Sequence, residues 1–291
     1  MGTTDTRLAR RLLESLDALE VDYAVLHSAA RVAELQTISD IDLLVDDEPA
    51  NVIRRLKVAV DSCELAHVLT WRYDTGALTT FWMTPGLADG VQLDLIRDPE
   101  GSGRYGVRTV DLADAFRIDA PWPRHLTERG TAHYLFAKRL VKGDVRRWEE
   151  AAHILRTGGG IDLALFAPRR QRVYRRAYEG RFPGRAFRVQ VLARQRLSHN
   201  GTRRLVRRTG EVVEVSGRLD QEARRFLEER VRPVVPQIVF LRRRPGALRR
   251  WSLTRRPRIV VVEVGGPSMS GATAARQIWE ALRARAYEES P

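Results

Sequence analysis

The first half of the chain alternates helix-like and strand-like segments, and this alternation restricts the folds that it can adopt. Apolar residues recur at helical spacing near residues 6–20 and 49–65, and strand-like segments lie at 22–27 and 40–45. Three more strand-like runs follow, separated by turn residues: AHVLTWRYD, ALTTFWMT and GVQLDLIRD. The order predicts an α/β fold, in which a small mixed sheet is flanked by helices.

The chain is long enough for two units, and the glycine-rich turn at residues 157–160 is the best candidate for the boundary between them. We therefore predict one domain over residues 1–157 and a second region over 158–291. Helical patterns dominate the second region, although PQIVFL and RIVVVEV are strand-like. We expect this region to be basic and mainly helical, ending in a strand, a turn and a helix.

The net charge of +13 is distributed unevenly along the chain. Residues 1–150 contain 19 Lys or Arg and 25 Asp or Glu, a net charge of −6, so residues 151–291 carry +19. This basic part could follow a nucleic-acid backbone, or its positive field could draw an anionic ligand toward the acidic half. The interpretation that we prefer is solvated arginine faces around a helical core. Aromatic residues that could stack on bases lie in the same part: Tyr174, Tyr178, Phe187 and Trp251.

The sequence contains no pattern typical of a membrane span or an export signal. No apolar run approaches the roughly 20 residues that cross a bilayer. The segment TRLARRLLESLDALE interleaves charged residues with Leu at helical spacing, which is typical of an amphipathic helix. The lone cysteine, Cys63, cannot form an internal disulfide and is expected to be a buried thiol. We therefore predict a cytoplasmic protein with no membrane partner.

Two carboxylates stand at the start of a buried strand, in the stretch TISDIDLLVDD. Side chains alternate between the faces of a strand, so Asp40 and Asp42 are expected to point into the same volume. A third carboxylate, Asp94, lies in another apolar strand that could pair beside the first. Ionised carboxylates repel one another, and a divalent cation relieves the repulsion by taking oxygen ligands from each of them. The three residues therefore predict a Mg²⁺ site.

The order of these segments resembles the nucleotidyltransferase superfamily of the DNA polymerase beta type. The strand YAVLHS is followed by 11 residues and then by Asp40 and Asp42 of SDIDLLV, and later by the strand VQLDLI with the third Asp. Together with YLFAKRLVKGDVRRWEE, the pattern is most similar to the uncharacterised, capsule-associated group of bacterial nucleotidyltransferase-like proteins. The resemblance covers about residues 20–150.

The resemblance implies a role for each matching residue. Asp40 and Asp42 would chelate the metal on a nucleoside triphosphate, and Asp94 would complete a second metal site and help to deprotonate a hydroxyl acceptor. Ser28 would contact the outgoing phosphates, and Ser39 would orient Asp40 or touch phosphate. The chemistry of a turn that offers N–H groups beside a hydroxyl agrees with this, because such a turn binds anions.

Two further features of this region bear on that interpretation. The superfamily usually has glycine where His27 stands, so His27 is left out of the catalytic set and could mark a protein that has lost catalysis. Lys138, Arg139 and Lys142 are close on one helix. Lys138 and Lys142 would neutralise triphosphate charge or reach toward the acceptor, or else they belong to a solvated helix face.

The C-terminal segment RIVVVEVGGPSMSGATAARQIWEAL has the order of a phosphate-binding loop. Gly266, Gly271 and Thr273 match the pattern G-x-x-x-x-G-K-[ST], but Ala272 replaces its lysine. The loss removes the point charge that binds the β- and γ-phosphates. The segment resembles the start of a thymidylate-kinase-like domain, and we expect a degenerate remnant that is kept for packing.

These features together predict an enzyme of nucleotidyl transfer. It would move a nucleoside monophosphate from an NTP to a hydroxyl acceptor, with Mg²⁺ as cofactor and release of pyrophosphate. The acceptor stays open: a small molecule, a protein side chain or an RNA end. The alternative is a non-catalytic pseudoenzyme that binds nucleic acid or another partner through its Arg-rich half.

Overall fold

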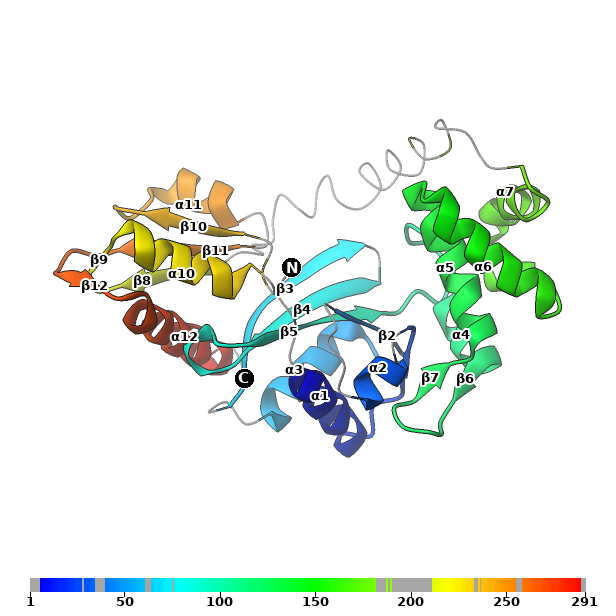
Figure 1. Cartoon of the computed structure of the whole chain (residues 1–291), viewed down its shortest axis with the longest axis horizontal. Coiled ribbons are helices and arrows are strands. Elements are labelled where there is room, and N and C mark those ends of the chain that lie inside the picture. Colours follow the sequence, from blue (N-terminus) through cyan, green and yellow to red (C-terminus); the bar gives the residue numbers. More distant parts are fainter. Residues whose placement is uncertain are drawn as a thin grey trace.

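The computed structural model confirms the predicted α/β class, with a mixed seven-stranded sheet at the centre of the molecule (Figure 1). The strand order in this sheet is β3-β4-β5-β2-β1-β7-β6. The structure describes residues 6–27, 29–34, 40–60, 64–74, 76–181, 187, 189, 211–232, 235, 237–254 and 258–288. Cys63 therefore lies outside the described residues.

The sheet contains both parallel and antiparallel strand pairs. β2 runs parallel to β5, and β1 runs parallel to β7, whereas the remaining neighbours are antiparallel. All residues of β2 and β4 are buried, including the polar side chains of Asp42, Thr79 and Thr80. The strands are β1 (Tyr23–Val25), β2 (Ile41–Val45), β3 (Ala66–Asp74), β4 (Ala77–Met83), β5 (Gly90–Ile96), β6 (Arg117–Ile118) and β7 (His125–Leu126).

Two helices predicted from the sequence pack against one face of the sheet. They are α1 (Thr6–Ala18) and α3 (Pro49–Ala59), with the short α2 (Ala29–Ala33) nearby (Figure 1). Leucines at helical spacing on α1 are fully buried in the same core as Leu43 and Leu93 of the sheet. α3 begins with a proline, whose missing N–H is not needed in the first turn.

A second helical layer begins with α4 (Thr109–Phe116) and α5 (Glu128–Lys142), and continues beyond the expected domain boundary. α6 (Val145–Thr157) is followed by a 3₁₀ turn, Leu163–Leu165, and by α7 (Pro168–Tyr178). Phe166 and Tyr174, which follow that boundary, lie in one core with residues of β1, β2 and α5. One apolar core thus continues past the boundary expected near residue 157, and the exposed Gly158 and Gly159 lie in the turn that follows α6.

The C-terminal part is built on a small parallel sheet with the order β10-β11-β8. The helix over QEARRFLEERV, the two strands and the final helix agree with the predicted pattern, but β8 was not anticipated. The elements of the C-terminal part are β8 (Glu211–Val215), β9 (Arg218–Leu219), α10 (Gln221–Val231), β10 (Ile238–Leu241), α11 (Ala247–Thr254), β11 (Ile259–Glu263), β12 (Ser268–Met269) and α12 (Gly271–Glu288).

The C-terminal part packs on the large sheet at β3, β4 and the 3₁₀ turn Pro85–Leu87. Phe81 and Met83 lie in one apolar core with Ile278 and Trp279 of α12. The indole Nε1 of Trp279 also donates to the carbonyl oxygen of Met83 at 3.4 Å.

Within the described residues, no helix is long and apolar enough to cross a membrane.

We expect Phe166→Ala to lower the free energy of unfolding by about 3 to 5 kcal/mol, because the ring is fully buried between β1, α5 and α7. Val145→Ala, at a position that is 44% exposed, is the control and should change it by less than about 0.5 kcal/mol. Chemical denaturation followed by circular dichroism measures both. A small effect of Phe166→Ala would mean that the core ends before residue 157.

Candidate metal centre

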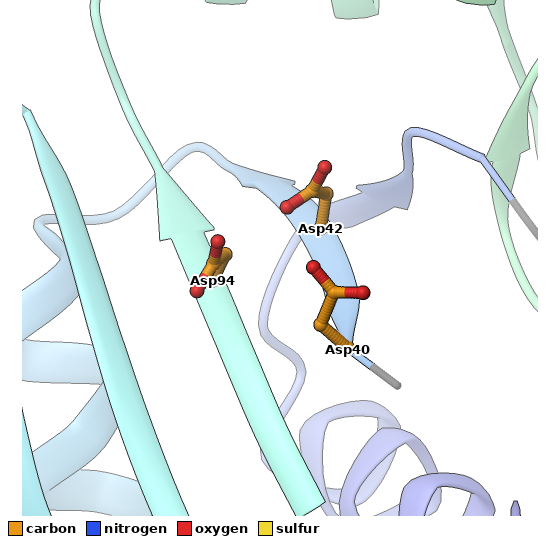
Figure 2. A group of neighbouring side chains, drawn as sticks. All are labelled: Asp40, Asp42 and Asp94. Atoms are coloured by element: carbon orange, nitrogen blue, oxygen red, sulfur yellow. The ribbon is translucent and has the colours of Figure 1, made fainter. Parts of the chain in front are cut away.

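The parallel pairing of β2 with β5 brings the predicted carboxylates together. Asp42 lies directly opposite Asp94 in the register, so the two side chains leave neighbouring strands on the same face. Asp40 stands two residues earlier, at the entrance to β2. One carboxylate oxygen of each residue lies within 4.8 Å of the others, and Figure 2 shows the three carboxylates facing one another.

Asp42 is the most buried of the three, with 1% of its surface exposed. Its Oδ2 atom lies 2.9 Å from His27 Nε2 and accepts a hydrogen bond from Lys138 Nζ at 2.6 Å. Burial opposes ionisation of this carboxyl, but the contact with His27 and the charge of Lys138 outweigh burial. They hold the pKa of Asp42 well below its usual range. Asp42 is therefore an anion with two donors on one oxygen.

The pKa of Asp94 is shifted in the opposite direction to that of Asp42. Its Oδ1 atom accepts hydrogen bonds from Thr79 Oγ1 at 2.7 Å and from Gln92 Nε2 at 3.1 Å. Burial and the nearby charge of Asp42 raise the pKa of Asp94 to about 7, although these two hydrogen bonds favour its ionised form. A proton therefore relieves the carboxylate repulsion when no cation is bound.

The charges of the cluster fit a divalent cation. With all three carboxylates ionised these residues carry −3, and Lys138 pairs with Asp42, the central one. Burial first, and then the charge of Asp42, raise the pKa of Asp94, so ionisation of all three carboxylates is unfavourable without a further positive charge. Carboxylate oxygens are the ligands that Mg²⁺ prefers, so Asp40, Asp42 and Asp94 would suit this ion.

The two predicted lysines differ in their surroundings. Lys138 on α5 contacts Asp42 and lies 5.3 Å above the ring of Tyr134. Burial lowers the pKa of Lys138, but the charge of Asp42 more than compensates and raises it. Lys142, about one helical turn further, is exposed, and partial burial together with the charge of Lys138 lowers its pKa. The structure thus brings Lys138 into the cluster and leaves Lys142 at its margin.

Some predicted residues cannot be placed, and some residues at the site were missed. Ser28 and Ser39 lie outside the described residues. His27 was left out of the catalytic set, yet it contacts Asp42 from a position two residues after β1, the strand paired with β2. Gln92 could have been found by alternation, since it lies two residues before Asp94 on the same face of β5. Thr79 could be identified only from the register of β4 with β5, and the sequence does not give this register.

The P-loop-like segment has the predicted order of strand, turn and helix, but its surroundings do not favour phosphate. Ser270 Oγ accepts from the backbone N–H of Thr273 and so caps the first turn of α12. A Cβ atom added at Gly271 would lie 2.6 Å from the Phe226 ring, so this glycine serves close packing. The adjoining groove, about 690 Å³, is lined by three acidic side chains, Asp220, Glu222 and Glu229, and by Arg225, which pairs with Glu229.

Comparison with known proteins adds no assignment: no family model matches the chain, and no curated protein matches it.

We expect Asp94→Asn to stabilise the metal-free protein at pH 8. The pKa of Asp94 is raised from 3.8 to about 7 on folding, so its contribution to stability is greatest at low pH and is lost as pH rises through that window. Asparagine keeps an oxygen acceptor for Thr79 and Gln92 and carries no charge. Since one pKa unit is worth about 1.4 kcal/mol, the gain is a few kcal/mol at most.

Thermal unfolding between pH 5 and 8 without divalent ions tests this effect. The wild-type chain should lose stability relative to Asp94→Asn as pH rises, and added Mg²⁺ should restore it only in the wild type. Asp114→Asn, at an exposed position on α4, is the control for loss of one carboxylate. Parallel pH curves for wild type and Asp94→Asn would contradict the expectation.

Proposed function

We propose that the chain is a Mg²⁺-dependent nucleotidyltransferase, which transfers a nucleoside monophosphate from an NTP to a hydroxyl acceptor. The observation that carries the proposal is the convergence of Asp40, Asp42 and Asp94 from two parallel strands onto one point. The resemblance of YAVLHS and SDIDLLV to the nucleotidyltransferase superfamily of the DNA polymerase beta type supports it. We also propose a cytoplasmic location, because the co-substrate is a nucleoside triphosphate.

In the proposed reaction, the acceptor oxygen forms a bond to the α-phosphorus of the NTP. The bond between this phosphorus and the oxygen bridging to the β-phosphate breaks, and pyrophosphate leaves with the electron pair. The proton of the acceptor hydroxyl passes to Asp94 or to water. Bound Mg²⁺ would supply electrostatic stabilisation of the charge on the phosphate oxygens.

The chain's own residues position these groups. Asp42, held as an anion by His27 and Lys138, is a fixed ligand with little freedom to rotate. Thr79 and Gln92 fix the orientation of Asp94 in the same way. Lys138 lies within reach of the same volume and can compensate charge on the triphosphate.

One observation favours a non-catalytic alternative. The ammonium of Lys138 already pairs with Asp42, as a built-in cation would in a protein that no longer binds metal. In that protein the carboxylates would be structural, and the arginines of the C-terminal half would bind nucleic acid or another partner. Binding of NTP distinguishes the two functions.

We expect calorimetry to show binding of at least one of ATP, GTP, CTP or UTP that requires Mg²⁺. Asp42→Asn should abolish the metal-dependent part, because it removes a ligand at the centre of the cluster. Asp114→Asn, an equivalent change on the surface of α4, should leave it intact. Binding of NTP that is the same with and without Mg²⁺, or that survives Asp42→Asn, would rule out the proposed enzyme.

Lys138→Met separates the two functions further. It removes one partner of a buried ion pair, so the metal-free protein should lose about 3 kcal/mol of stability. If the carboxylates bind metal, Mg²⁺ should recover part of this loss, because the ion replaces the missing positive charge. Lys142→Met, at an exposed position about one turn further along α5, is the matched control. Melting curves with and without Mg²⁺ measure both, and no recovery would favour the structural alternative.

A further inference from the structure

The donors around Asp42 gather on one of its two carboxylate oxygens. Each oxygen of a carboxylate can accept about two hydrogen bonds. His27 Nε2 at 2.9 Å and Lys138 Nζ at 2.6 Å both contact Oδ2. Of the nitrogen donors in the described part of the chain, none contacts Oδ1 of Asp42. Asp42 therefore has one oxygen, Oδ1, left for a metal ion.

Asp94 has the same one-sided arrangement of donors. Thr79 Oγ1 at 2.7 Å and Gln92 Nε2 at 3.1 Å both donate to Oδ1 of Asp94. The sheet sets both donors, because Thr79 lies opposite Asp94 on β4 and Gln92 precedes Asp94 by two residues on β5. Asp94 therefore also has one oxygen, Oδ2, left for a metal ion.

The remaining oxygens are enough for one ion. Asp40, which is half-buried at the entrance to β2, brings the third carboxylate. One oxygen of each of the three residues lies within 4.8 Å of the others, and Figure 2 shows that the carboxylates converge. Mg²⁺ takes its oxygen ligands in an octahedron and usually keeps several waters. Three carboxylates can thus hold one ion and leave its other positions to water or phosphate.

A second ion would find few ligands in this cluster. Two-metal sites hold their ions about 3.5 to 4 Å apart. Asp42 and Asp94 cannot each give one oxygen to either ion, because both positions on one of their oxygens are already filled. On Asp42 the ammonium of Lys138 lies where a second ion would bind, and two cations so close repel each other.

The contacts of Lys138 hold its ammonium in this position. The side chain is only 12% exposed, and Nζ lies 5.3 Å from the centre of the Tyr134 ring. Tyr134 is itself buried, and Tyr105 packs edge-on against it with ring centroids 5.8 Å apart. The ammonium would lose both Asp42 and Tyr134 if it moved away, so it is a fixed positive charge of the site.

Resting on the metal-dependent function proposed above, we infer that the carboxylate cluster binds a single divalent cation, and that the ammonium of Lys138 takes the place of a second one. Asp40, Asp42 and Asp94 then ligate the same ion. This arrangement differs from the two metal sites that the family resemblance implies. The second positive charge of the site belongs to the chain itself.

The test counts the Mn²⁺ ions bound by the full chain without NTP. Mn²⁺ accepts the same oxygen ligands as Mg²⁺, and electron paramagnetic resonance measures the unbound ion. The wild-type chain should bind one ion. Lys138→Met should bind two, because Oδ2 of Asp42 becomes accessible and the repelling charge is gone. Lys138→Arg, which keeps the charge, and Lys142→Met, the matched control on α5, should each bind one.

The spectrum of the bound ions separates a second ion in the cluster from one adsorbed elsewhere. Two Mn²⁺ ions about 4 Å apart are magnetically coupled, so Lys138→Met should give the spectrum of a pair and the wild type that of an isolated ion. If Lys138→Met does not fold, Lys138→Gln replaces it, since glutamine is neutral but can still donate to Asp42.

Each outcome decides between the inference and the proposed enzyme. A coupled pair of ions in the wild-type chain would overturn the inference and leave the enzyme in place. A single ion in both the wild type and the neutral Lys138 variants would also overturn it, because the ammonium would then replace no ion. Absence of any bound ion in the wild type would overturn the inference and the proposed function together.

Discussion

The parallel pairing of β2 with β5 is the constraint on which the candidate site depends. It sets Asp42 directly opposite Asp94 inside a sheet whose apolar residues are buried on both sides of the pair. Carboxylates in such a place repel each other and lose solvation, and the fold tolerates them through a small number of specific donors. His27 and Lys138 stabilise the charge on Asp42, while Thr79 and Gln92 hold Asp94.

The sequence contained enough information for the first half of the fold and for the acidic cluster. Helical spacing located α1 and α3, and apolar runs bounded by turn residues located the strands that carry Asp42 and Asp94. The pairing of those strands was a hypothesis, because Leu43 and Leu93 show only that each strand is buried, not which strands are neighbours. The contacts of His27 and Lys138 depend on three separated elements, and therefore no local pattern could reveal them.

For the second half of the chain, the sequence predicted less of the structure. Arginine density suggested a mainly helical region beginning near residue 157, but Phe166 and Tyr174 complete a core that begins at β1. Glycines at 158–160 had the composition of a linker, and only tertiary contacts show that they form a turn. The strand β8 was missed because EVVEV is short, and its burial depends on pairing with β11 from almost fifty residues further along the chain.

The ion pair between Lys138 and Asp42 has a consequence for how the molecule is assembled. Many small metalloproteins reach their final shape only when the ion arrives, since the unfolded ligands repel one another. Here a lysine from α5 occupies one side of the central carboxylate, so the strands and the helix can come together with an internal counter-ion. Folding can therefore bring Asp42 into the core together with a positive partner that belongs to the chain itself.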